Sequence, residues 1–349
     1  MSDGLAPIPL GPNQPDRPYL GGAGIAALRG VAAEDAYRSE DFIASVTEVF
    51  AGGGVGLSRL PDGRLLRNVI DADPEPFLGA AHVARFGTST ELLVKLLDTG
   101  ERLFVHLHPD AGFASRELGA QHGKTEAWIV VGTRQVDDQP AAPYALVGFT
   151  RAVSAEEVER WVEEQDVAGM QAAMHRLELA EGDTLFVPAG VPHAIGPGIT
   201  LVELQEPTDL SILLEYTGYR GLGPDDAFLG LPREVALSAL DRTAASADEL
   251  AVLLGRGEAL RGAPGARRLL PATAEPFFRA TRVDAEPGTP VALPRGFAVL
   301  VILDGAGVLD WIDGSLPVTR GDTLVIPDAI GDTRLTGAVG GILCRPPLP

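Results

Sequence analysis

Three histidines and one glutamate stand at spacings that could hold a divalent metal ion. His106 and His108 alternate in an apolar stretch, so their side chains would project from one face of an extended strand. Lys124 and Glu126 alternate in the same way, and His193 follows an apolar segment that ends in a Pro-x-Gly turn. Three imidazoles and one carboxylate can then converge. Zn²⁺, one ion per chain, is the first choice for such ligands, although Fe²⁺, Mn²⁺, Co²⁺ or Ni²⁺ would also fit.

The remaining histidines, His82, His122 and His175, belong to neither of these stretches. A single histidine in an apolar segment is more often a hydrogen-bonded structural residue than a metal ligand. We therefore expect these three side chains to lie outside the metal site.

The positions of the metal-site residues match the two sequence motifs of the cupin barrel. In the first motif, Gly100 is followed after five residues by the His-x-His pair, and in the second, Gly182 is followed by Pro188, Gly190 and His193. The glutamate comes later in the chain than is usual for cupins. This resemblance implies a jelly-roll barrel around the metal.

Composition favours a β-rich protein over a helical bundle. A chain of 349 residues exceeds what a single core usually organises, so we expect two or three modules. The 45% of hydrophobic residues, with 42 Gly and 28 Pro, are typical of many short strands joined by turns.

The charge of the chain excludes some classes of partner. With 48 acidic against 28 basic residues the net charge is −20, whereas binding to nucleic acid or anionic lipid needs clustered Lys and Arg. The expected partner is a small molecule.

The sequence also indicates a compartment. The longest apolar run, 297–303, is far too short to cross the roughly 30 Å core of a bilayer, and no basic-then-apolar signal opens the sequence. The single cysteine, Cys344, excludes an intramolecular disulfide and is expected to be a buried small hydrophobe. We expect a cytoplasmic protein.

The first hundred residues contain an arm, a helical cap and a strand. Residues 1–20 carry five prolines and predict an extended arm on the surface. Residues 21–29 and 34–50 have helix-compatible spacing. The apolar run 92–97 predicts a buried strand whose Lys95 either enters a cavity or extends outward to water.

The middle of the chain alternates between strands and helices. We expect 127–131 and 145–149 to pair as strands, and Ser154 with Glu157 predicts the start of a helix that runs to about residue 165. The further expected elements are a helix at 169–176, strands at 177–179, 184–187, 199–204 and 211–216, and two short helices within 230–262.

An internal repeat predicts a second module. Residues 321–329 repeat the pattern of 182–189, but Asp332 stands where the repeat would place the metal histidine, and 265–349 contain no His. The expected fold is mainly β with helical insertions, built from two cupin (jelly-roll) barrels of which the second is degenerate and metal-free. The expected domains are an arm, cap and metal-binding catalytic barrel (1–229), a helical linker (230–264) and the degenerate barrel (265–349).

Several of these segments together resemble the type I phosphomannose isomerases. The matching segments are 92–95, 103–110, 123–126, 187–190 and 193–196, within a region from about 92 to 210. The N-terminal Arg-Pro-Tyr-Leu-Gly-Gly at 17–22 is loosely similar to the family's Arg-Pro-Trp-Gly opening, and a second barrel suits the family's architecture.

The resemblance implies roles for individual residues. It makes His108, Glu126 and His193 metal ligands, with His106 where the family generally has Gln, and it places Lys124 at the family's active-site lysine. It matches Glu203 to a glutamate proposed as the proton-transfer base. The plainer interpretations are that Lys124 only pairs with Glu126 and that Glu203 is a solvated carboxylate; beside a dication both would have shifted pKa values.

The chain departs from the family at two positions that help to bind phosphate or stabilise charge. Phe104 stands where the family usually has Ser, and Leu213 stands where it has Arg, four residues after the Asp that matches Asp209. A buried dianion needs charge-assisted hydrogen bonds. Lys95, Asp209 and Arg220 are the predicted substrate-binding residues, with Arg220 as a replacement phosphate partner or an ordinary surface arginine.

The function predicted from these parts is metal-dependent aldose–ketose isomerisation through an enediolate. A Lewis-acid metal and one carboxylate that shuttles a proton suffice for this chemistry. Mannose 6-phosphate and fructose 6-phosphate are the best-matching substrates. The alternatives are an isomerase of an unphosphorylated or sulfonated hexose and a non-catalytic carbohydrate-binding or regulatory cupin; oxygenation is disfavoured because a fourth protein ligand leaves fewer open positions for oxygen.

Overall fold

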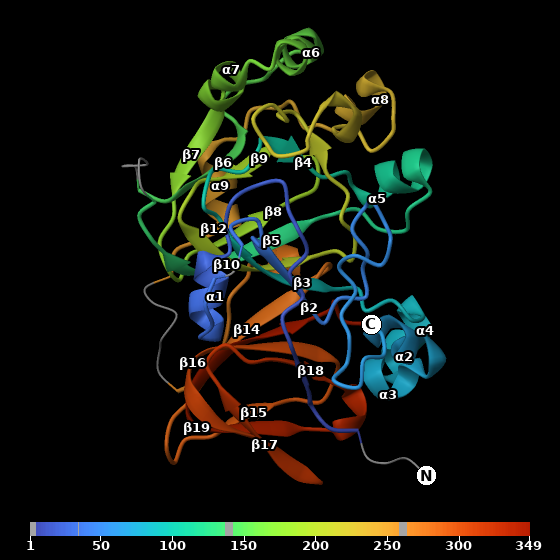
Figure 1. Ribbon diagram of the computed structural model, residues 1–349, viewed down its shortest axis with the longest axis vertical. Coiled ribbons are helices and arrows are strands. Elements are labelled where there is room, and N and C mark those ends of the chain that lie inside the picture. Colours follow the sequence, from blue (N-terminus) through green and yellow to red (C-terminus); the bar gives the residue numbers. More distant parts are fainter. Residues whose placement is uncertain (1–4, 34, 137–141, 258–263) are drawn as a thin grey trace.

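Three β-sheets make up most of the protein, and helices cover their outer faces and edges (Figure 1). The structure is a computed structural model and describes residues 5–33, 35–136, 142–257 and 264–349. The fold is mainly β, as the composition predicts. The sheet nearest the C-terminus forms one end of the molecule, and the other two sheets form the rest of its body (Figure 1).

A six-stranded sheet lies in the middle of the molecule. Alternate residues of its central strands face opposite ways, as they must in a pleated strand: Val94 and Leu96 pack in one core with residues of the C-terminal sheet, whereas Lys95 lines a cavity on the other side. In order across the sheet the strands are β12 (Leu254–Gly255), β8 (Thr184–Val187), β5 (Glu126–Thr133), β10 (Ile199–Gln205), β3 (Leu93–Asp98) and β2 (Glu40–Ile43).

A five-stranded sheet covers the face that carries Lys95. Between the two sheets lies an apolar core that includes Trp128, Val147 and Leu201. The far side of the five-stranded sheet packs against helices α6 and α7. Its strands in order are β11 (Ile212–Leu213), β4 (His106–Leu107), β9 (His193–Ile195), β6 (Tyr144–Phe149) and β7 (Met174–Glu178).

The C-terminal sheet curls around an apolar core of its own. Its main strands are β1 (Ile8–Leu10), β18 (Thr323–Ile326), β16 (Ala298–Trp311), β19 (Thr333–Arg345), β14 (Arg279–Ala285) and β13 (Gly265–Arg268), with β15 (Val291–Leu293) paired to β19 and β17 (Gly314–Thr319) paired to β16. Among the described residues each of the three sheets is an open path of strands, so none of them closes into a barrel.

The helices are short and lie outside the sheets. Ser154 caps α6 by accepting a hydrogen bond from the N–H of Glu157 at 3.2 Å, as the sequence predicts. The helices are α1 (Ala23–Arg29), α2 (Leu66–Ala72), α3 (Pro74–Leu78), α4 (Ala80–Phe86), α5 (Ala111–Phe113), η1 (Ala114–Leu118), α6 (Ala155–Glu164), α7 (Val167–Ala172), η2 (Pro224–Asp226), α8 (Arg233–Leu237), α9 (Ala247–Leu253), η3 (Ala272–Ala274) and η4 (Asp328–Ile330).

The N-terminal arm is more than a surface segment, contrary to the prediction. Its strand β1 pairs with β18 and so extends the C-terminal sheet. Further along the arm, Tyr19 is buried. The arm therefore connects the two ends of the molecule and contributes side chains to the interior between the other sheets.

Other local predictions are also wrong. The described part of 34–50 contains the strand β2 instead of a helix, because Phe42 and Ile43 complete the edge of the six-stranded sheet. Strands β5 and β6 both exist but belong to different sheets and do not pair. The helix expected at 169–176 ends at Ala172, and its last residues begin strand β7.

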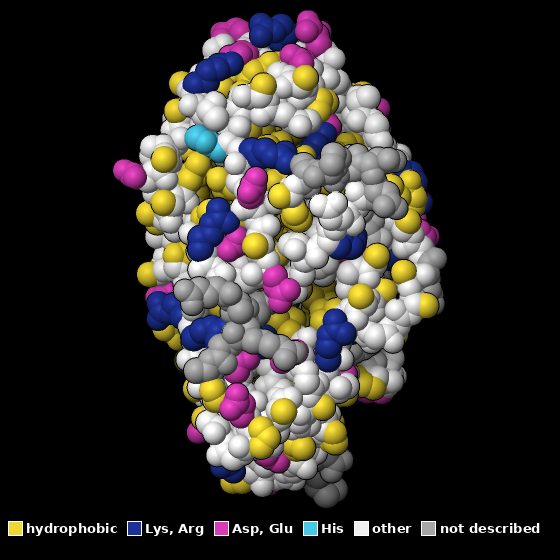
Figure 2. All heavy atoms as spheres, turned by 90° about the vertical axis from the view of Figure 1, so that its left-hand side faces the viewer, with side chains coloured by type: hydrophobic (Ala, Val, Ile, Leu, Met, Phe, Trp, Pro, Cys, Tyr) yellow, Lys and Arg dark blue, Asp and Glu magenta, His cyan; other side chains and the backbone are white. Residues whose placement is uncertain are grey.

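Charges are spread over the surface. Figure 2 shows Lys and Arg side chains interspersed with Asp and Glu on one face, without a continuous basic patch on that face. None of the described helices combines the length and the apolar character that a membrane crossing requires.

Candidate active site

A small cavity of about 30 Å³ lies between the six-stranded and five-stranded sheets. The five-stranded sheet contributes the imidazole of His106 and the six-stranded sheet contributes carboxylates and a lysine, while the N-terminal arm covers one side. The polar residues that line it are Arg17, Tyr19, Glu40, Lys95, His106, Lys124, Glu126, Glu203, Asp209 and Ser211.

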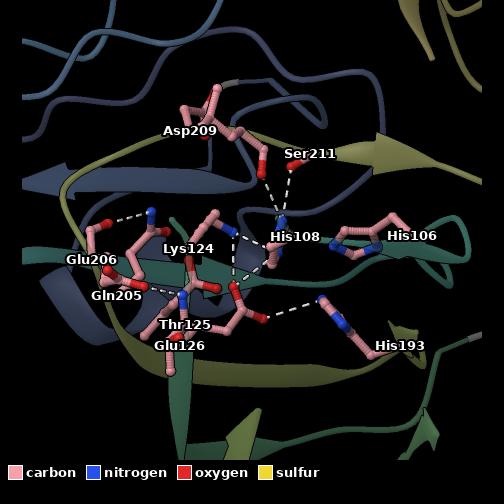
Figure 3. A network of polar contacts seen from close by, with 12 residues as sticks. His106, His108, Lys124, Thr125, Glu126, His193, Gln205, Glu206, Asp209 and Ser211 are labelled. Atoms are coloured by element: carbon pink, nitrogen blue, oxygen red, sulfur yellow. Dashed lines mark hydrogen bonds and ion pairs between the residues drawn. The ribbon is translucent and has the colours of Figure 1, made fainter. Parts of the chain in front are cut away.

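The three predicted histidines converge, and one of them, His106, lines this cavity. His106 on β4 and His193 on β9 are direct cross-strand partners, with ring centroids 4.1 Å apart. The ring of His108 lies 4.9 Å from each of the other two. One nitrogen from each ring lies within 4.8 Å of the others, and Figure 3 shows the rings turned toward a common centre.

Backbone carbonyls orient all three rings. The Nδ1 atoms of His106, His108 and His193 lie 3.0, 2.8 and 2.9 Å from the carbonyl oxygens of Phe104, Leu210 and Val191, respectively. A carbonyl can only accept, so each Nδ1 carries the proton and each Nε2 presents a lone pair. Such outer hydrogen bonds are typical of metal-binding histidines.

The set fits a metal ion. Burial, followed by the neighbouring imidazoles, keeps the pKa of His106 well below its usual value, and burial together with Lys124 lowers the pKa of His108 to about 3. The rings of His106 and His108 are therefore neutral, which is the form that binds metals. His193 Nε2 is buried and receives no hydrogen bond, although it lies 3.3 Å from Glu126 Oε1. Three imidazole nitrogens with inward lone pairs fit one Zn²⁺ per chain.

Glu126 is the carboxylate beside these imidazoles, at the start of β5. Its Oε2 lies 3.0 Å from His108 Nε2 and accepts a hydrogen bond from Lys124 Nζ at 2.7 Å. Its Oε1 accepts from Trp128 Nε1 at 2.9 Å. Burial opposes ionisation of Glu126, but Lys124 and the histidines outweigh it and hold its pKa well below the usual value. Lys124 also lies 2.8 Å from His108 Nε2 (Figure 3).

Glu203 and Lys95 face each other across paired strands on the far side of the cavity. They are direct partners in the β10–β3 register, and Lys95 Nζ lies 3.7 Å from Glu203 Oε2. Burial, and next the charge of Glu126, raise the pKa of Glu203 to about 7. Lys95 is only 3% exposed, so the alternative that it extends outward to water is wrong.

A network of charges surrounds Lys95. Its Nζ lies 3.1 Å from Glu40 Oε2 and 3.3 Å from Asp209 Oδ1. Burial opposes its charge, yet these carboxylates raise its pKa above the usual value. The same lysine lies 4.5 Å from the centre of the Phe42 ring, a cation–π contact.

Sequence reasoning missed three residues of this network. Arg17 Nε donates to Glu40 Oε1 at 2.8 Å, and the Tyr19 hydroxyl donates to the same oxygen. Arg17 and Lys95 outweigh the effect of burial and lower the pKa of Glu40 to about 2. The Arg-Pro-Tyr segment at 17–19 was a weak signal for two of them. Glu40 had none, because its strand was predicted to be helical.

The two positions that depart from the family, and the possible replacement Arg220, lie in different places. Phe104 lines the cavity with its ring 5.1 Å from His106, and Leu213 is buried in the adjacent core. Arg220 does not reach the cavity, which corrects the predicted substrate contact. Its side chain is 43% exposed, donates to Asp16 at 2.8 Å and lies over the Tyr37 ring.

The histidines excluded from the site lie elsewhere, as predicted. His82 and His175 bond to backbone carbonyls at 2.7 and 2.8 Å, and His122 lies 2.8 Å from the carboxylate of Glu91. Cys344 is buried in the core, and burial raises the pKa of its thiol.

The chain is similar in sequence to mannose-6-phosphate isomerases. A protein of Bacillus subtilis named putative mannose-6-phosphate isomerase is 24% identical over 251 residues, which are 72% of this chain and 73% of that protein. Mannose-6-phosphate isomerase of Streptococcus mutans is 33% identical over 136 residues, 38% of this chain and 40% of the relative. No protein-family model matches the chain.

Solved structures of the same kind share its fold. The mannose 6-phosphate isomerase of Bacillus subtilis has a TM-score of 0.73 at 20% identity and covers 98% of this chain and 100% of its own. A mannose 6-phosphate isomerase bound with zinc and yttrium has a TM-score of 0.72 at 15% identity and covers 99% of this chain and 100% of its own. The chain thus resembles mannose-6-phosphate isomerases in sequence and shares their fold, as the sequence motifs implied.

Proposed function

We propose that the protein is a metal-dependent aldose–ketose isomerase that interconverts mannose 6-phosphate and fructose 6-phosphate through an enediolate. The observation that carries the proposal is the buried Glu203, with a pKa raised to about 7, in the small cavity that is also lined by His106, one of three converging imidazoles. The names of the relatives support the substrate.

In this proposal His106, His108, Glu126 and His193 hold the metal. The histidines supply inward lone pairs, and the Glu126 carboxylate lies within 3.3 Å of two of the three ring nitrogens. A bound Zn²⁺ would supply Lewis acidity toward a carbonyl or hydroxyl oxygen of the sugar.

Glu203 is the proposed proton shuttle. A carboxylate with a pKa of about 7 is partly ionised at neutral pH, so it can remove a proton from carbon and then return it. It takes the proton from C2 of the aldose, so that the C1–C2 bond gains double-bond character and O1 becomes an enediolate oxygen. The proton then returns to C1, and the O2 hydroxyl proton passes to O1, which leaves O2 as the ketone oxygen. An ordinary exposed glutamate would be a weaker base at this pH.

The two lysines have separate proposed roles. Lys124 is bonded to His108 and Glu126, so its ammonium can also donate to a substrate oxygen near the metal site and stabilise negative charge there. Lys95 and Asp209 are paired with each other at 3.3 Å and present a donor and an acceptor to sugar hydroxyls.

We propose Arg17 as the phosphate contact in place of Arg220. Its side chain is 19% exposed, more than those of Lys95 and Lys124 at 3% and 6%, so it lies closest to solvent among the cations that line the cavity. A guanidinium can bind two phosphate oxygens at once.

One observation favours the alternative of an unphosphorylated hexose. Every cation of the cavity wall already has a carboxylate partner: Arg17 and Lys95 pair with Glu40, and Lys124 pairs with Glu126. A phosphate dianion would have to compete with these carboxylates. A neutral hexose would need only their hydrogen bonds.

The domain boundaries belong to the same proposal. We propose that residues 1–229 and 265–349 are two cupin-type modules joined by a helical linker at 230–264. The common turn that precedes β8 and β18 supports two related modules. The pairing of β1 with β18 means that the arm crosses this boundary in space.

Solvent deuterium exchange tests the proposed reaction. Zinc-loaded protein and mannose 6-phosphate are incubated in deuterated water, and the sugars are followed by NMR. We expect fructose 6-phosphate to form and deuterium to enter at C1 or C2, with mannose compared in parallel. Binding of either sugar without turnover and without deuterium uptake would instead support a non-catalytic carbohydrate-binding protein.

A further inference from the structure

A second and much larger cavity lies at the C-terminal sheet, remote from the metal site in sequence. Its volume is about 750 Å³. Its walls come from the α3–α4 junction, from the segment 293–297 after β15, and from the residues that follow β19. Figure 1 shows the C-terminus beside α4, on the side of the molecule where α2, α3 and α4 lie.

Two arginines stand opposite each other in the wall of this cavity. Arg279 is the first residue of β14, Arg345 is the last residue of β19, and the two are direct partners in the register of these strands. Like charges directly opposite in a sheet repel and destabilise it. Both side chains are partly buried, and burial lowers the pKa of Arg279 and, with added repulsion from Arg279, that of Arg345 to about 10.

Within the described part of the chain neither arginine has a carboxylate partner. The nearest acidic groups are engaged by other arginines: Arg295 donates to Asp328 at 2.6 Å, and Arg268 pairs with Glu275. This is unusual in a chain with 48 acidic and only 28 basic residues, where carboxylates are abundant. Among the described residues the cavity wall thus keeps two guanidinium groups that have nearby carboxylates but no ion pair of their own.

Hydrogen bonds to backbone carbonyls hold the two guanidinium groups but use only some of their N–H donors. Arg279 Nε donates to the carbonyl of Pro346 at 2.9 Å, so its two terminal nitrogens stay available. The terminal nitrogens of Arg345 donate to the carbonyls of Pro294 and Arg295. Gly296 makes room for this side chain, since a Cβ there would come within 2.5 Å of Arg345 Nη1.

We propose that this cavity binds a small phosphate-bearing molecule, with Arg279 and Arg345 holding the phosphate. Two adjacent guanidinium groups match a phosphate dianion in charge and in the geometry of their N–H donors. A single carboxylate would neutralise only one of their two positive charges. Asp328 lies in the same wall but is bonded to Arg295, so the phosphate sits toward the β14–β19 side. The volume of the cavity has room for an organic group as well.

Calorimetric titration of the zinc-loaded protein with inorganic phosphate, at constant ionic strength, tests this site. Arg279→Gln and Arg345→Gln should each weaken binding by at least roughly tenfold, the loss expected for a charged hydrogen bond. Arg334→Gln is the matched control, because Arg334 is an exposed arginine on the same strand β19. Arg17→Ala separates the two sites: heat that persists in Arg17→Ala and disappears in Arg279→Gln belongs to this cavity.

Thermal unfolding distinguishes binding from a structural role. In phosphate-free buffer the two Gln variants should unfold at a higher temperature than the wild type, because the repulsion is removed, and phosphate should raise the Tm of the wild type more than that of either variant. If a Gln variant does not fold, Arg279→Lys and Arg345→Lys replace it. Lysine keeps the positive charge but cannot bind two phosphate oxygens as a guanidinium does, so phosphate binding should still weaken. Absence of phosphate binding in the wild type, or equal binding by wild type and variants, would overturn the proposal.

Discussion

Strands β8 and β18 are preceded by turns of the same type, but the side chains around the two strands differ. Gly182 and Gly321 precede them with φ angles of 94° and 91°, conformations that favour glycine. Asp183 and Asp322 each accept a hydrogen bond from the backbone N–H three residues earlier, at 3.0 and 2.7 Å. The two turns have nearly the same hydrogen bonding although they share only part of their sequence.

The residues behind the two strands differ in kind. The chain after β8 reaches His193, whereas Asp332 occupies the corresponding position after β18 and accepts a hydrogen bond from the backbone N–H of Arg295 at 2.8 Å. The core beside β18 is filled with aliphatic side chains such as Leu300 and Leu335. The cavity beside β8 is lined by buried ionisable groups instead.

The two strands show that the same backbone turn can occur with and without a metal site. The turn and strand recur without the chemistry, so the function depends on the inward-facing positions of neighbouring strands. Buried charges are costly unless they are paired, and in the metal-site cavity Glu40, Lys95 and Glu126 are indeed paired. Substitutions at the two turns and in the cavity should therefore differ in their effects.

Replacing His193 with alanine should have the largest effect. It removes one of three converging nitrogens, so bound zinc, measured by elemental analysis, should be lost. Loss of a Lewis acid removes several kcal/mol of transition-state stabilisation, which corresponds to a decrease in turnover on the order of 10³-fold or more. His175→Ala is the control, since His175 bonds only to a backbone carbonyl. A fully active protein without metal would contradict the account.

Glu203→Gln should lower turnover and keep the metal. The amide fills the same space but cannot take a proton, so kcat should fall by roughly 10²- to 10⁴-fold, the range for general acid–base groups. The zinc content should be that of the wild type. Glu178→Gln, at an exposed strand position, serves as the control and should be active. Equal losses in both variants would rule out a specific role for Glu203.

Arg17→Ala should affect the phosphorylated sugar selectively. Loss of a charged hydrogen bond costs about 1.5–3 kcal/mol, so kcat/KM for mannose 6-phosphate should fall roughly 10- to 100-fold. The value for mannose should change much less. Arg220→Ala is the matched control, because Arg220 is exposed and bonded to Asp16. If both substrates suffer equally, Arg17 only supports the charge network around Glu40.

Asp332→His should have the smallest effect. It places a histidine at the repeat position of His193, but 265–349 supply no other histidine and the adjoining core is apolar. We expect zinc to stay at one ion per chain and the activity to be unchanged. A second equivalent of zinc in this variant would show that the turn and strand alone nearly suffice for a metal site.

Local sequence patterns predicted the metal site well. The alternation of His106 and His108 and the Pro-x-Gly turn before His193 are local features, and the two strands that carry them are direct neighbours. The burial of Lys95 within an apolar run was likewise visible as one of two alternatives. Such features depend on spacing within a few residues, which the chain itself displays.

Long-range pairing could not be predicted in the same way. The spacing of Phe42, Val46 and Phe50 suggested a helix, but the edge of β3 was available for pairing and β2 formed there. The position of Glu40 in the cavity wall was therefore not predicted. The predicted pairing of β5 with β6 was wrong for the same reason, because tertiary packing decides which strands become partners.

The pH dependence of kcat/KM, compared between the wild type and Glu203→Gln, tests whether Glu203 is the catalytic base. The base must be ionised to accept a proton, and burial raises the pKa of Glu203 to about 7. We therefore predict that kcat/KM of the zinc-loaded wild type increases with pH, is half-maximal at about pH 7 and levels off above that pH. The residual activity of Glu203→Gln should lack this limb. A wild-type profile that is flat from pH 5 to pH 8, or the same limb in Glu203→Gln at roughly the same pH, would contradict the assignment of Glu203 as the base.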